Sequence, residues 1–92
     1  MHDWTLVTIE IDWKQGTLVI QLKNAITSTE LSAIGVIDLH VPRHREWGPS
    51  VSINEAAISD RDENGNATVT IQMQTGDELK ITAAEFVLPK GF

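Results

Sequence analysis

A cluster of histidines and charged side chains spans Asp38 to Glu46, with the sequence DLHVPRHRE. His40 and His44, together with the carboxylates at the two ends of the cluster, offer ligands for zinc or groups for acid–base catalysis. Pro42 prevents the helix that would bring positions four apart onto one face, and along an extended chain the two histidines stand about 13 Å apart. We therefore interpret the cluster as a solvated strand end and loop.

An enzyme would have to use His40 or His44 with nearby carboxylates, and this remains an alternative interpretation. The sequence contains no nucleophile motif, no pair of acids at a recognisable spacing and no glycine-rich phosphate loop. We therefore assign no catalytic residues and expect a protein that is not an enzyme.

The segment 60–68, DRDENGNAT, begins like a calcium-binding loop. Asp60, Asp62 and Asn64 occupy alternate positions and a glycine follows, as in loops where oxygen ligands converge on one ion. The twelfth position is Ile71 where such loops carry a bidentate glutamate, and strands are expected on both sides. Because the same residues also favour β-turns, we interpret the segment as a turn without a metal or other cofactor. A weak calcium site at Asp60, Asp62 and Asn64 is kept as an alternative.

A tryptophan, Trp47, lies in the charged connection HREWGPSVSIN, where a Gly-Pro pair turns the chain towards the next strand. It could close the open end of the sheet as a core residue, or act as the anchor of a binding surface, and one indole can do both. Tryptophan beside arginine is typical of binding hot spots. The candidate partner-binding residues are therefore Arg43, His44, Arg45, Glu46 and Trp47.

The composition limits which partners the chain can have. Its 92 residues are enough for one domain, residues 1–92, and the formal charge of −6 disfavours binding to nucleic acids or anionic membranes. Without cysteine there is no disulfide and no thiolate chemistry. The acidic amino end is unlike a signal peptide, and no apolar run is long enough to span a bilayer. We expect a cytoplasmic protein.

Alternation of apolar and polar residues predicts six strands. In the first, Val7, Ile9 and Ile11 are expected to face inwards. The segment 24–33 is ambiguous, since Thr27 and Glu30 match a helix capping box although β-branched residues disfavour a helix there. The expected strands are residues 5–11, 17–23, 34–41, 51–58, 67–74 and 78–88.

Short turns between these segments predict an all-β fold, with antiparallel strands in a meander-like order. A flat sheet of this size would bury too little apolar surface to form a core. A strongly curved sheet, a small sandwich or a partly open barrel is therefore expected. Interrupted alternation at LVI (residues 18–20) and IGVI (residues 34–37) indicates that both faces are partly apolar. Unpaired sheet edges allow either a monomer or an edge-paired homodimer.

The stretch WGPSVSIN, between the hairpin IDWKQGTLVIQL and the hairpin TIQMQTGDELKITA, resembles a group of short uncharacterised bacterial proteins. The likeness covers most of the chain, and W-G-x-S-x-S-I-N is its most specific part. Some of these proteins are similar to immunity proteins of toxin systems. The resemblance implies a small cytoplasmic β domain without catalytic residues, and its likeness to immunity proteins implies toxin neutralisation for some members. We therefore predict non-enzymatic binding of an unidentified protein.

Overall fold

The computed structural model describes residues 4–43 and 52–92, and six strands account for most of them. Every neighbouring pair of strands is antiparallel, and all six belong to one sheet. This confirms the all-β prediction. The strands are β1 (Thr5–Asp12), β2 (Thr17–Lys23), β3 (Ser28–His40), β4 (Ile53–Ile58), β5 (Ala67–Met73) and β6 (Glu78–Val87).

The strand order in the sheet is β1-β2-β3-β6-β5-β4. Each half of the chain forms a three-stranded meander, and the two halves meet where β3 pairs with β6. A single meander would instead have placed β4 beside β3. The observed order buries the two longest strands in the middle of the sheet and sends the connection after β3 to the opposite edge.

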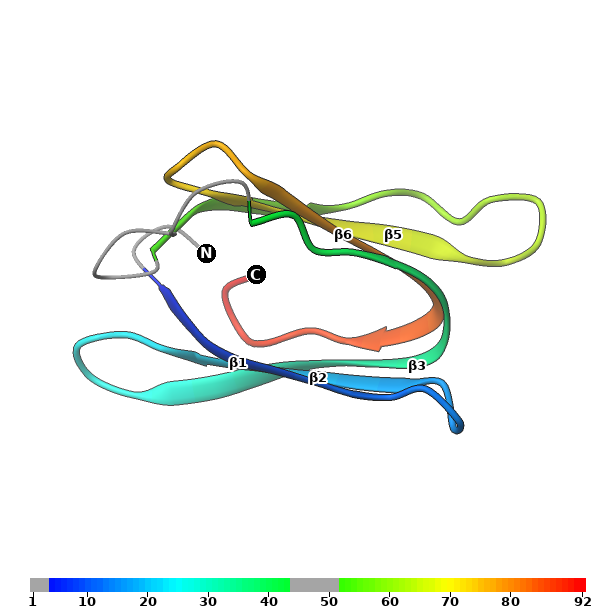
Figure 1. Cartoon of the computed structure of the whole chain (residues 1–92), viewed down its shortest axis with the longest axis horizontal. Coiled ribbons are helices and arrows are strands. Elements are labelled where there is room, and N and C mark those ends of the chain that lie inside the picture. The colour runs from blue at the N-terminus through cyan, green and yellow to red at the C-terminus, as the bar shows by residue number, and fades with distance from the viewer. Residues whose placement is uncertain (1–3, 44–51) are drawn as a thin grey trace.

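The sheet folds over on itself, because β3 and β6 each run from one layer into the other (Figure 1). Gly35, in the middle of β3, has a φ of 71°, a backbone conformation that glycine adopts without strain. The pairing of β3 with β6 also shifts register between Val36 and Asp38, as at a β-bulge. Bulges and glycines bend strands sharply, so the turn between the layers occurs here.

The two edge strands approach each other at one end of the folded sheet. Thr5 and Ser52 form an isolated antiparallel bridge, and the Ile53 amide donates a hydrogen bond of 2.8 Å to the Trp4 carbonyl. No strand pairing continues from this bridge within the described residues. The architecture is therefore a strongly curved sheet that remains a partly open barrel.

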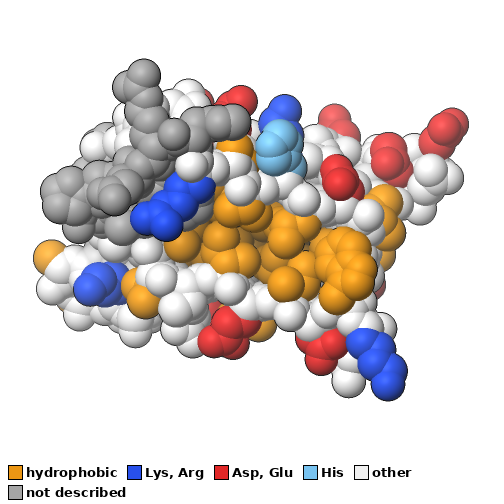
Figure 2. Space-filling view, viewed as in Figure 1, with side chains coloured by type: hydrophobic (Ala, Val, Ile, Leu, Met, Phe, Trp, Pro, Cys, Tyr) orange, Lys and Arg blue, Asp and Glu red, His pale blue; other side chains and the backbone are white. Residues whose placement is uncertain are grey.

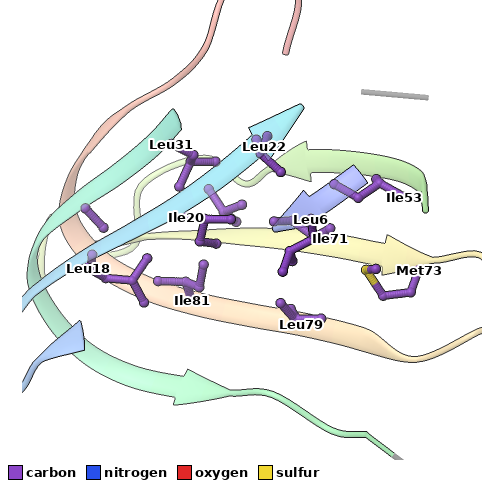
Figure 3. Close-up of a cluster of buried hydrophobic side chains, with 13 residues drawn as sticks. Leu6, Leu18, Ile20, Leu22, Leu31, Ile53, Ile71, Met73, Leu79 and Ile81 are labelled. Atoms are coloured by element: carbon purple, nitrogen blue, oxygen red, sulfur yellow. The ribbon is translucent and has the colours of Figure 1, made fainter. Parts of the chain in front are cut away.

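Inward-facing side chains from all six strands form the core between the layers (Figure 3). The alternation in β5 is confirmed, since its odd-numbered residues are buried and its even-numbered residues are not. The segment after β6 also packs on this core through Leu88 and Phe92. The fully buried large side chains are Leu18, Ile20, Leu22, Leu31, Ile53, Val69, Ile71, Met73, Leu79 and Ile81.

The prediction that Val7 faces inwards is wrong. The pairing of β1 with β2 shifts register between Leu6 and Thr8, which turns Val7 outwards to 48% exposure and leaves Leu6 buried. An extra residue in one strand reverses the alternation on one side of it. Ile9 still packs against the core, as expected. The prediction for Ile11 is also wrong, since this side chain is 38% exposed near the end of β1.

The helical interpretation of the segment 24–33 is also wrong. The Asn24 side-chain oxygen accepts hydrogen bonds from the Ile26 and Thr27 amides, at 2.9 and 2.8 Å. This side chain closes a tight turn, and Ser28 then pairs with Lys23 at the start of β3. The turn satisfies the Thr27 amide, which the Glu30 side chain would have satisfied in a capping box, and the following β-branched residues continue as a strand.

Candidate functional site

The histidine cluster is only partly within the described residues. His40 is exposed at the end of β3, directly across from Lys80. It borders a shallow depression of about 270 Å³, which Asp77 and Glu78 also line. No group of three or more His, Cys, Asp or Glu side chains is placed to hold a metal ion within residues 4–43 and 52–92.

Of the candidate partner-binding residues, the structure describes Arg43 alone. Arg43 is exposed, three residues after the end of β3. His44, Arg45, Glu46 and Trp47 lie outside the described residues. Only the first residue of the site that the sequence predicts can therefore be placed.

The loop 60–66 uses its Asp62 carboxylate to stabilise a turn. One oxygen, Oδ1, accepts hydrogen bonds from the Asn64 amide at 2.9 Å and from the Asn66 amide at 3.0 Å. These contacts are those of a side chain that shapes its own turn. They involve one of the two carboxylate oxygens, and they support the turn interpretation.

Arg61 ties the same loop to the central strand β6. Its guanidinium donates one hydrogen bond to the Gly65 carbonyl at 2.6 Å and another to the Ala84 carbonyl. The loop between β4 and β5 is therefore tied to β6, the strand that pairs with β5. These two hydrogen bonds give Arg61 a structural role in holding the loop.

An apolar surface lies on the open side of the folded sheet. Figure 2 shows it as a continuous orange area between the two layers, with a histidine and basic side chains at its upper margin. In the same view, the segment after β6 crosses this gap (Figure 1). That segment carries Leu88 and Phe92, which are half-buried against the core, and Pro89, which is buried. We call this the open-side surface.

A second apolar surface was missed when the sequence was interpreted. Ser32 of β3 lies between Val19 of β2 and Val87 of β6 in one cross-strand row. Ile34 follows on the same face, because side chains two apart in a strand share a face. Ile34 is 53% exposed and Val87 is 62% exposed. We call the face around these side chains the outer sheet face.

Carboxylates surround these apolar side chains. Glu10 lies across from Val19, and Glu85 lies across from Ile34. Glu30 comes two residues before Ser32, and Asp12 is separated from Ile34 by Thr17 alone. All four carboxylates belong to exposed residues. The outer sheet face therefore has an apolar centre and an acidic rim.

The interrupted alternation at residues 18–20 and 34–37 was the signal for this face. It indicated apolar residues on both sides of β2 and β3, and Val19 and Ile34 are those residues. The third apolar member, Val87, is more than fifty residues away from Ile34 in sequence and reaches it only through the pairing of β3 with β6. Local pattern alone could not bring the three together.

One end of the outer sheet face is hollowed. A depression of about 540 Å³ lies between β1, β2 and β3, beside the Val7 bulge. Gln21, Lys23, Ser28 and Glu30 are among its lining residues. Lys23 is the one basic residue among those that line this depression.

Comparisons with known proteins add no family to these observations. No protein-family model, no curated protein and no solved structure matches the chain. Among the residues that the structure describes, there is no helix of the length and apolar character needed to cross a membrane.

Proposed function

We propose that the chain is a non-enzymatic domain that binds a protein partner. The observation that carries this proposal is the open-side surface, a continuous apolar area on a small acidic protein. Monomeric proteins rarely expose large contiguous apolar areas unless these are used in binding. A partner that covers the gap between the layers would bury this area.

The candidate residues from the sequence are compatible with the same surface. Arg43 follows β3, and basic side chains border the apolar area in Figure 2. An apolar centre with charged groups at its margin is the usual anatomy of a protein interface. In this proposal the apolar side chains supply affinity, while Arg43 and the segment that follows it fix the orientation of the partner.

The resemblance to immunity proteins makes toxin neutralisation the specific form of this proposal. Neutralisation needs only a complementary surface that blocks the active site of a toxin, and no catalytic group on the blocking protein. The partner is then a protein of the same cell or of a competing one, and the complex forms in the cytoplasm.

The test is capture of partners from a lysate of the native host, with the purified protein as bait. Arg43→Glu reverses a charge at an exposed residue, and Phe92→Asp places a charge in the open-side surface. Both variants should lose a protein that the wild type retains. Ile58→Thr changes a partly exposed residue of edge strand β4 and serves as the matched control.

Thermal unfolding of each variant separates loss of binding from loss of fold. Trp47→Ala tests the anchor that the sequence predicts, and it is informative when this variant melts like the wild type. A folded Arg43→Glu, Phe92→Asp or Trp47→Ala variant that retains the same protein as the wild type would contradict the assignment of that residue. If all three do so, the proposed surface is wrong.

A further inference from the structure

We propose that the outer sheet face is a second binding surface, and that it takes a cationic protein segment carrying apolar side chains. This surface is distinct from the open-side surface, since its side chains point away from the core on the opposite side of β2 and β3. It is built from four strands that are brought together by the pairing of β3 with β6.

The apolar centre supplies the first part of the argument. Ile34 and Val87 are more than half exposed, and half-buried Val19 lies in the same cross-strand row as Val87. Outward positions of a solvated antiparallel sheet are normally polar. The three side chains of this apolar centre are β-branched and lie on neighbouring strands. A partner that covers them would remove apolar area from water.

The acidic rim defines the chemistry of the occupant. None of these carboxylates lies directly across from a basic residue, since the cross-strand partners of Glu10, Glu30 and Glu85 are Val19, Gln21 and Ile34. Lys23 lines the same depression as Glu30. A lysine or arginine of a partner, placed beside the apolar centre, would lie close to these carboxylates. Complementary charge accelerates encounter and selects among partners more than it adds affinity.

The same charges exclude other occupants. A second copy would bring an identical acidic face against this one, in a protein with a formal charge of −6. Phosphate-rich surfaces, whether nucleic acid or anionic membrane, would be repelled in the same way. A protein segment in which basic and apolar side chains alternate would contact both the acidic rim and the apolar centre. An extended strand has the required period of two.

The test uses a short synthetic peptide in which lysine alternates with valine and isoleucine, and a second peptide with glutamate in place of each lysine. Backbone amide shifts of the full chain should move at β2, β3 and β6 when the lysine peptide is added. The lysine peptide should bind about tenfold more tightly than the glutamate peptide at low salt, and the difference should shrink as salt screens the charges.

Variants assign the two parts of the face separately. The double variant Ile34→Thr, Val87→Thr keeps β-branched side chains and should weaken the lysine peptide about tenfold at every salt concentration. The double variant Glu30→Gln, Glu85→Gln should weaken it mainly at low salt. Glu63→Gln, in the loop between β4 and β5, removes one negative charge elsewhere and is the matched control.

Equal binding of the two peptides would overturn the charge argument. Shifts confined to the open-side surface, or no shifts up to the solubility limit of the lysine peptide, would overturn the second surface altogether. None of these results bears on capture through Arg43 and Phe92, so the proposed function stands or falls independently.

Discussion

Ala84 of β6 packs directly against Gly35 of β3, so closely that a Cβ atom on Gly35 would lie 3.0 Å from the Ala84 Cβ. Gly35 also has a positive φ of 71°. Backbone conformation and crowding therefore both require glycine at the point where the sheet turns from one layer into the other.

The first prediction concerns this contact. Gly35→Ala should lower the free energy of unfolding by about 2 kcal/mol or more, because the left-handed backbone is strained for alanine and Ala84 must also move. Gly76→Ala is the matched control, with a φ of 98° but open space around the added methyl group. Urea unfolding of both variants isolates the contribution of the crowding, which is absent if the two lose equal stability.

Thr8 provides a second test. Its hydroxyl is buried and has no hydrogen-bond partner among the described residues. Thr8→Val should raise the free energy of unfolding by about 1 kcal/mol, because it replaces an unsatisfied polar group with a methyl group. Thr68→Val should lower it by about as much, since Thr68 and Thr82 share a hydroxyl hydrogen bond of 2.9 Å. A loss of stability in Thr8→Val would show that its hydroxyl is satisfied in solution.

Calcium should leave the melting temperature unchanged, because no group of three or more acidic or histidine side chains is placed to hold a metal ion within the described part of the chain. Asp62→Ala should lower the free energy of unfolding by about 1 kcal/mol through loss of the hydrogen bonds to two backbone amides, whereas Asp60→Ala should have little effect. Differential scanning calorimetry with millimolar calcium and with chelator is the measurement. If calcium raises the melting temperature of the wild type but not that of Asp60→Ala, the loop is an ion site instead.

Arg61 should contribute more to the free energy of unfolding than its exposed position suggests. Arg61→Met keeps much of the aliphatic stem but removes the hydrogen bonds to the Gly65 and Ala84 carbonyls, at a cost of about 1 kcal/mol. Amide hydrogen exchange in the loop 60–66 should accelerate at the same time. Arg43→Met, at a residue for which no such bonds are seen among the described residues, should change stability by less than about 0.5 kcal/mol. Equal effects would mean that the loop is not held by Arg61.

A strand with an uninterrupted period of two could be predicted from sequence, as β5 shows. The segment around Thr27 and Glu30 suggested a helix that does not form. A capping box and a turn closed by an asparagine side chain place similar residues before an apolar run. The reversal at Val7 could not be predicted either, since a bulge in one strand depends on the register with its neighbour.

The candidate sites also differ in how far the sequence could predict them. Arg43 and the loop 60–66 were found as contiguous segments, and Asp62 proved to shape a turn. The outer sheet face could not be assembled from the sequence, because Ile34 and Val87 become neighbours only through a long-range pairing. Its apolar members were individually visible as interruptions of the alternating pattern.

The position of β6 also bears on how the protein is made. This last of the six strands fills the middle of the sheet, between β3 and β5. Until residues 78–87 have left the ribosome, both neighbours expose an unpaired edge, and such edges recruit other chains. Substitutions that delay insertion of β6 should therefore appear first as lower soluble yield, in molecules whose completed fold melts normally.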